Sequence, residues 1–98
     1  MSFHHRSVTT ETLDWRGFLI QVTYEPQRFV DHLQVETLEP VRAPLPITET
    51  GYRSHFISKD VIDDSGGPAA YVLDWLDRAA TGRGWYAIEE RVRQLELL

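Results

Sequence analysis

The amino-acid sequence predicts an α+β fold, with a three- or four-stranded antiparallel sheet over residues 8–57 packed by two C-terminal helices at about 68–81 and 85–96. Two observations predict this fold. Apolar and polar residues alternate through much of residues 8–57, which is the period of a half-buried strand. Beyond Gly66, apolar residues recur every three or four positions, which is the period of an amphipathic helix. We expect a flexible leader at residues 1–7 and a single domain over residues 8–98.

The clearest predicted strand covers residues 18–24, where four apolar side chains alternate with mixed ones. Residues 14–17, ending in Gly17, predict the turn that joins it to a first strand over residues 8–13. Pro26 ends the second strand, because proline cannot donate to a ladder. Residues 32–38 resume the alternation as a third strand.

Prolines at positions 40, 44 and 46 favour an extended segment and exclude a helix between residues 39 and 47. Residues 52–57 are interpreted as a fourth strand. Because successive side chains of a strand point to opposite faces, Tyr52, Ser54 and Phe56 are expected on one face. Arg53, His55 and Ile57 are expected on the other.

Residues 58–64 predict a short helical turn that ends at Gly66. Pro68 then stands at the first position of the main helix, where a missing N–H is tolerated. The second long helix carries its apolar residues at positions 85, 88, 92 and 95. Glu89 lies four residues before Arg93, a spacing that predicts an ion pair on the solvent side of this helix.

Composition excludes several classes of function. The chain has no cysteine, which rules out disulfides, thiolate metal sites and cysteine nucleophiles. Fifteen acidic residues outnumber ten basic ones, giving a formal charge of −5 that disfavours direct nucleic-acid binding. No signal peptide and no membrane-length apolar run is present. We expect a cytoplasmic protein that does not interact with membranes.

The residues that could carry chemistry form no recognisable catalytic or metal-binding motif. None of the four histidines forms an i, i+4 pair, so no metal and no cofactor is predicted. Ser54 and His55 are adjacent on a strand and point to opposite faces, which argues against a nucleophile and base pair. Residues 66–68 open a helix without the lysine of a phosphate-binding loop. The sequence favours a protein that is not an enzyme.

Binding residues are easier to nominate. Arg53 and His55, with Tyr52 beside them, could form a polar binding surface on the fourth strand. Trp75 lies at the edge of the apolar stripe of the main helix, four residues after Tyr71, and Trp85 opens the next helix. Partly exposed tryptophan and tyrosine are frequent anchors of protein interfaces. The candidate partner-binding or ligand-binding residues are therefore Tyr52, Arg53, His55, Trp75 and Trp85.

Two segments carry a resemblance to other proteins. Residues 45–56 (LPITETGYRSHF) and 66–77 (GGPAAYVLDWLD) resemble a group of small bacterial proteins of unassigned function, often met among plasmid and integrated-element genes. The resemblance extends over roughly residues 13–98. It implies a bacterial, mobile-element setting and brings no activity, cofactor or site residue with it.

These observations do not identify a biochemical function, but they rank three hypotheses. The first is a non-enzymatic interaction protein, a regulator or accessory subunit that binds another protein or a second copy of itself as a homodimer. The second is an acidic inhibitor that occupies the nucleic-acid groove of an enzyme, which requires its helical aspartates to line one face. The third is a small enzyme or ligand-binding domain that uses Tyr52, Arg53 and His55 in a cleft.

Overall fold

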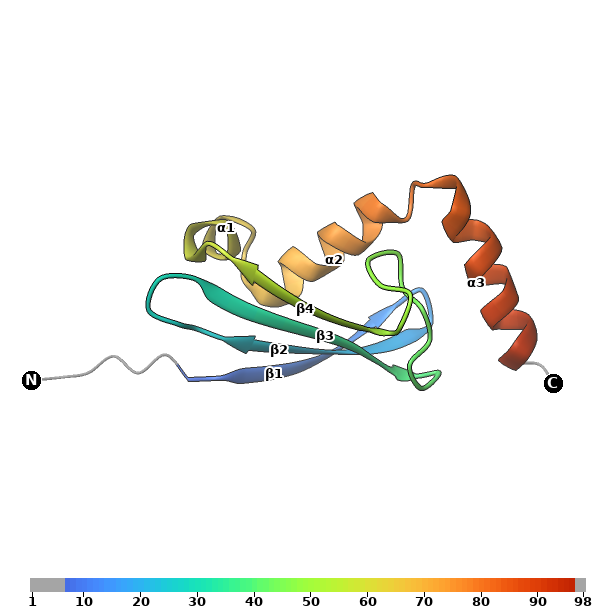
Figure 1. The fold of residues 1–98 in the computed structure, drawn as a ribbon, viewed down its shortest axis with the longest axis horizontal. Coiled ribbons are helices and arrows are strands. Elements are labelled where there is room, and N and C mark those ends of the chain that lie inside the picture. Colours follow the sequence, from blue (N-terminus) through green and yellow to red (C-terminus); the bar gives the residue numbers. More distant parts are fainter. Residues whose placement is uncertain (1–6, 97–98) are drawn as a thin grey trace, which may run out of the picture.

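A computed structural model describes residues 7–96 of the chain, apart from the side chain of Arg83. Four strands form one antiparallel sheet in the order β1-β2-β3-β4, and helices follow them along the chain (Figure 1). This confirms the predicted α+β class, with four strands in the sheet. The elements are β1 (Thr9–Trp15), β2 (Phe18–Glu25), β3 (Asp31–Glu39), β4 (Tyr52–Ile57), α1 (Lys59–Asp64), α2 (Pro68–Ala79) and α3 (Arg83–Glu96).

The helix boundaries differ slightly from those predicted. α2 ends at Ala79 rather than near residue 81, and α3 begins at Arg83 rather than at Trp85. Residues 1–6 of the predicted leader lie outside the described residues. None of the helices within residues 7–96 is long and apolar enough to cross a membrane.

The turn between β1 and β2 is tighter than predicted. Only Arg16 and Gly17 form it, with φ angles of 52° and 86°. Two positive φ values are what a two-residue hairpin turn of type I′ requires. Trp15 therefore belongs to β1, where it pairs with Phe18, and it does not lie in the turn. The Asp14 carboxylate accepts a hydrogen bond from the Gly17 N–H at 3.1 Å.

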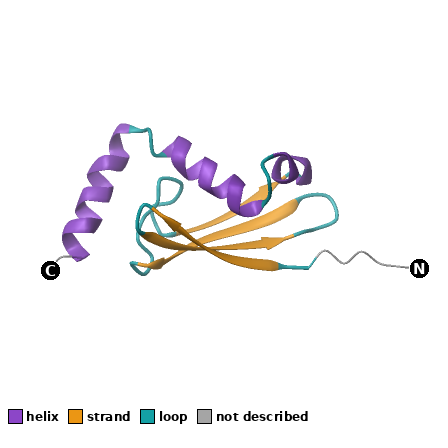
Figure 2. Cartoon of the chain, turned by 180° about the vertical axis from the view of Figure 1, so that it is seen from behind, coloured by secondary structure: helices purple, strands orange, loops and turns teal. Residues whose placement is uncertain are grey.

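The core lies between the sheet and α2, which crosses one face of the sheet and leaves the opposite face uncovered (Figures 1 and 2). Alternate residues of β2 and β3 are buried and the residues between them are half-buried. Burying each large aliphatic side chain contributes about 1.5–3 kcal/mol. The largest of the fully buried apolar side chains are Ile20, Val22, Leu33, Val35, Ile62, Val72 and Leu76.

α3 packs by its first turns against the end of the sheet where β1 and β2 meet. The ring centre of Trp85 lies 5.6 Å from that of Trp15 and 5.9 Å from that of Phe18. Glu89, expected on the solvent side, is only 7% exposed, so this part of the helix prediction is wrong. The carboxylate is buried beside the β1–β2 turn, where Arg16 approaches it at 3.6 Å and Arg93 at 3.4 Å. These partners are needed because a buried unpaired charge is strongly destabilising.

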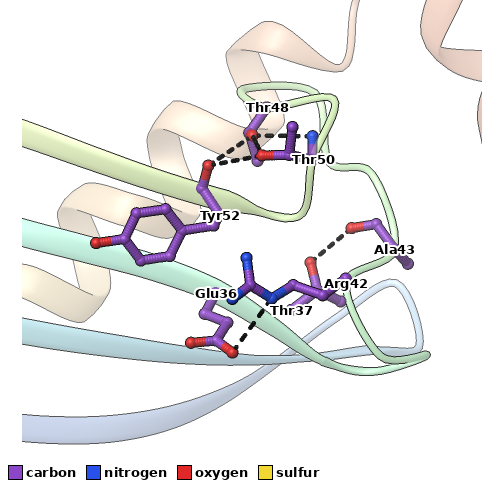
Figure 3. A network of polar contacts seen from close by, with 7 residues as sticks. All are labelled: Glu36, Thr37, Arg42, Ala43, Thr48, Thr50 and Tyr52. Atoms are coloured by element: carbon purple, nitrogen blue, oxygen red, sulfur yellow. Dashed lines mark hydrogen bonds and ion pairs between the residues drawn. The ribbon is translucent and has the colours of Figure 1, made fainter.

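The proline-containing segment between β3 and β4 is fastened to the end of β3. Thr37 donates its hydroxyl hydrogen to the carbonyl oxygen of Ala43 at 2.7 Å, a contact drawn in Figure 3. The Thr37 N–H donates to the carbonyl oxygen of Gly51 at 2.9 Å. Gly51 has a φ of +76°, and a Cβ atom there would lie 2.5 Å from the backbone carbonyl of Arg42. Only glycine fits this close approach of two backbone segments.

Candidate functional site

Four side chains from β4 and α2 converge on the helix-covered side of the sheet, at its β4 edge. Arg53 and His55 are alternate residues of β4 and face α2, while Tyr71 and Trp75 are one helical turn apart. The ring centres of His55 and Trp75 are 4.5 Å apart, and those of Tyr71 and Trp75 are 5.8 Å apart. The His55 and Tyr71 rings are 6.3 Å apart and nearly parallel. We call these four residues the arginine-aromatic cluster.

The cluster is accessible to a partner. Its three rings are half-buried and Arg53 is exposed. The guanidinium carbon of Arg53 lies 5.6 Å from the centre of the Trp75 ring, in the range of a cation–π contact. Its Nη1 donates to the carbonyl oxygen of Ile47 at 3.2 Å. Within the described part of the chain, Arg53 forms no ion pair with a carboxylate.

Electrostatics leave the cluster with one positive charge. Burial, helped by the charge of Arg53, lowers the pKa of His55 from its ordinary value of 6.5. Burial also raises the pKa of Tyr71; Arg78 opposes this shift and Asp74 adds to it. At neutral pH both rings are therefore uncharged, and Arg53 supplies the charge of the surface.

The lowered pKa of His55 predicts a loss of stability in mild acid. The folded protein binds a proton at His55 less readily than the unfolded chain, so stability falls as pH drops below 6.5 and through the lowered pKa. We expect the stability advantage of the native protein over His55→Gln to shrink between about pH 7 and about pH 5. Urea unfolding of both proteins across this range measures it. An advantage that stays constant with pH would contradict the assignment.

The other two predicted binding residues lie elsewhere. Tyr52 points to the uncovered face, where the guanidinium carbon of Arg42 lies 5.5 Å from its ring centre and Glu36 pairs with Arg42 at 3.6 Å (Figure 3). Trp85 is only 4% exposed and belongs to the core. The structure therefore brings together Arg53, His55 and Trp75 out of the five. It does not place Tyr52, Arg53 and His55 around one cleft.

Tyr71 is the member of the cluster that was not among the predicted binding residues. Its spacing of four from Trp75 places both rings on one side of α2, and that spacing is visible in the sequence. The sequence could not show that this side of the helix would meet His55. The phenol and imidazole groups approach to 3.5 Å, between the Tyr71 hydroxyl and Nε2 of His55.

A groove of about 560 Å³ borders the cluster and shares Arg53 with it. One wall is the segment of residues 45–50, and the opposite wall comes from the end of α2 and the start of α3, including Ala79 and Ile88. The groove thus combines apolar side chains with the polar residues 48–50, among them Glu49, and Arg53 lines it next to Trp75. A partner bound to the cluster could continue into it.

Among the described residues, the polar side chains outside the cluster form local pairs. Within residues 7–96, no three histidine and carboxylate side chains are placed to hold a metal ion. Ser54 pairs with His32 and not with His55: its hydroxyl lies 2.6 Å from Nε2 of His32 on the uncovered face. On the same face, the His32 ring stacks on the Phe56 ring, with 4.6 Å between the two ring centres.

The hypothesis of an acidic inhibitor requires the aspartates of α1 and α2 to line one face of the molecule. They are divided between two helices, and those of α2 already have partners. Asp74 forms an ion pair with Arg78 at 2.9 Å. Asp77 accepts a hydrogen bond from the indole N–H of Trp15 at 2.9 Å.

The fold and the cluster define a small α+β domain with one uncovered sheet face and a surface patch of half-buried aromatic rings beside an exposed arginine. The chain belongs to the family described as the KlcB third domain, which matches residues 8–85. This match includes every strand, α2 and all four residues of the arginine-aromatic cluster, and it ends before most of α3. No curated protein and no solved structure matches the chain.

Proposed function

We propose that this domain binds another protein through the arginine-aromatic cluster and acts as an accessory or regulatory module without catalysis. The observation that supports this is the exposed Arg53, which lies over Trp75 and has no carboxylate partner among the described residues. Tryptophan, tyrosine and arginine are the residues that most often dominate the binding energy of protein interfaces. The family description, a third domain, fits a module that works beside other domains.

The cluster also suggests the chemistry of the partner. A carboxylate would satisfy Arg53, and an aliphatic or aromatic side chain next to it would cover the rings of Tyr71 and Trp75. The neighbouring groove supplies further apolar contact at residues such as Pro46 and Ile88, whereas its side at residues 48–50 is polar and includes Glu49. We therefore propose an acidic residue flanked by apolar ones as the partner's contact.

The setting of this function is proposed on the sequence alone. The resemblance of residues 45–56 and 66–77 to plasmid and integrated-element proteins supports a bacterial, mobile-element setting. The lack of cysteine is compatible with the reducing cytoplasm. The inhibitor hypothesis gains no support, because two of the five helical aspartates already have partners within the domain.

A capture experiment tests the proposed surface. The purified chain, immobilised through one terminus, is exposed to a lysate of the cells that encode it, and bound proteins are quantified by mass spectrometry. We expect Arg53→Ala combined with Trp75→Ala to lose the specific partner at least about tenfold, as removal of two interface anchors does.

The matched control is Phe56→Ala. Phe56 is 60% exposed and belongs to the same strand, but it lies on the opposite face of the sheet. This variant is expected to capture as much partner as the native chain. If both variants lose the partner equally, or neither does, the cluster is not the binding surface. Circular dichroism of each variant verifies that the fold is intact.

A further inference from the structure

We infer that the free edge of β1 pairs with β1 of a second copy, so that two four-stranded sheets join into one continuous antiparallel sheet. The order β1-β2-β3-β4 places β1 and β4 at opposite edges. The pairing is therefore separate from the arginine-aromatic cluster, which lies at the β4 edge. It leaves that cluster open in both copies.

The β1 edge has only two of the features that normally block strand addition, the acidic side chains of Glu11 and Asp14. Residues 9–12 are exposed on both faces of the sheet, and Asp14 is exposed as well. Among residues 7–96, Figures 1 and 2 show no helix or loop beyond the first half of β1 on the side away from β2. The strand contains no lysine, arginine or proline, and its register with β2 runs without a bulge from Thr9 to Trp15. Natural proteins usually protect an edge with such residues or with a bulge.

The hairpin turn fixes which backbone groups of β1 are free. Trp15 and Phe18 flank a two-residue turn and therefore form a hydrogen-bonded pair. In an antiparallel ladder every second residue points the same way, so the N–H and C=O groups of three residues point away from β2. These residues are Thr10, Thr12 and Asp14.

The β4 edge differs in this respect. The hydroxyl groups of Thr48 and Thr50 both donate to the carbonyl oxygen of Tyr52, at 2.8 Å and 3.2 Å (Figure 3). This occupies the first outward carbonyl of β4. Among the hydrogen bonds of the described residues, none occupies an outward backbone group of β1. β4 still has unused outward groups at Ser54 and Phe56, but β1 offers three such residues in an unbroken row.

Symmetry and charge select one register for a second copy. A two-fold axis at Thr12 pairs Thr12 with its own copy and Thr10 with Asp14, which uses all three outward residues of each strand in about six hydrogen bonds. Centring on Glu11 would set two carboxylates directly opposite each other. Centring on Leu13 would place Thr10 opposite Arg16. Arg16 is a turn residue with a φ of 52°, so it cannot continue the ladder. A threonine pair at the centre is also a favourable cross-strand contact.

The absence of native cysteine allows a direct test. In this register the two Thr12 Cα atoms lie about 5.5 Å apart, within the range that a disulfide spans. We expect Thr12→Cys to form a disulfide-linked dimer under mild oxidation. Ser54→Cys, at the other edge, is expected to stay monomeric. Equal cross-linking of both variants, or none at Thr12→Cys, would overturn the proposal.

Two further variants address the interface without relying on a disulfide. Proline is tolerated at an edge position whose N–H faces outward, so Thr12→Pro should keep the fold and abolish the dimer in analytical ultracentrifugation. In the proposed register the two Glu11 side chains are diagonal neighbours. Glu11→Gln should therefore tighten the dimer by about two- to fivefold. A species that stays a discrete dimer in analytical ultracentrifugation distinguishes this gain from aggregation, and a dimer that Glu11→Gln does not strengthen would overturn this register.

The outcome is independent of the proposed function. Thr12→Pro should capture the partner of the arginine-aromatic cluster as well as the native chain does, whereas the variant lacking Arg53 and Trp75 should still dimerise. A native chain that fails to dimerise while it still captures the partner would reject the β1 pairing alone. A native chain that dimerises without capturing a partner would leave the pairing standing.

Discussion

Replacing Trp85 with alanine is expected to lower the free energy of unfolding by about 3–5 kcal/mol, the usual cost of removing a buried large aromatic side chain. Trp85 is 4% exposed and packs against Trp15 and Phe18, which hold the first turns of α3 to the end of the sheet. Denaturant unfolding at constant m value measures the loss. Because domains of this size are stable by only about 5–15 kcal/mol, the variant should be close to its unfolding midpoint under mild conditions.

Trp75→Ala provides the matched comparison. Trp75 is half-buried and lies over Arg53 and His55 at the surface, so its removal leaves a smaller cavity than that of Trp85. We expect a smaller loss of stability together with reduced partner capture. Equal destabilisation by the two substitutions would contradict the assignment of Trp85 to the core and Trp75 to the binding surface.

Gly51→Ala is the second substitution with a large expected effect. The new Cβ would meet the Arg42 backbone at 2.5 Å, and the φ of +76° is unfavourable for alanine. Strain at positive φ and a clash with backbone that cannot swing away together should cost about 3 kcal/mol or more. For a domain of this size that corresponds to a fall in Tm of roughly 12 °C or more, measurable by calorimetry.

Gly17→Ala separates the two causes. Gly17 also has a positive φ, of +86°, but a Cβ atom added there would meet no atom of another part of the chain within 4 Å. We expect a loss of only about 1 kcal/mol from the unfavourable φ. If Gly17→Ala and Gly51→Ala have equal effects, the close approach of Gly51 to Arg42 contributes nothing to stability.

The sheet could be predicted from the sequence because a strand that buries one face alternates apolar and polar residues. Residues 18–24 alternate in polarity, and the same residues alternate between buried and half-buried positions in β2. The parity of β4 likewise predicted correctly that Arg53 and His55 share a face opposite to Tyr52. Such patterns need only the two-residue period of a strand.

The position of α3 could not be predicted in the same way. Its apolar stripe indicated one buried side, but Glu89 is buried too because the tight β1–β2 turn places Arg16 next to it. Nothing near Glu89 in the sequence indicates that partner. Buried charges depend on contacts between distant segments, and a spacing of four residues to Arg93 alone suggested a surface ion pair.

The candidate site was predictable only in its parts. The sequence nominated Arg53, His55 and Trp75 separately, and Tyr71 was visible only as a neighbour on the helix. Their meeting depends on how α2 crosses the sheet at the β4 edge, which is a property of the tertiary packing. Trp85 could not be distinguished from Trp75 as an interface anchor, because both lie on amphipathic helices near apolar residues.

Site-specific photo-cross-linking tests the central claim, that partner binding occurs at the arginine-aromatic cluster, most directly. A benzophenone amino acid replaces Tyr71 in one version of the chain and Phe56, on the opposite face of the sheet, in another. We expect irradiation to link the captured partner to position 71 and not to position 56. A partner linked only at position 56, or equally at both, would contradict the account.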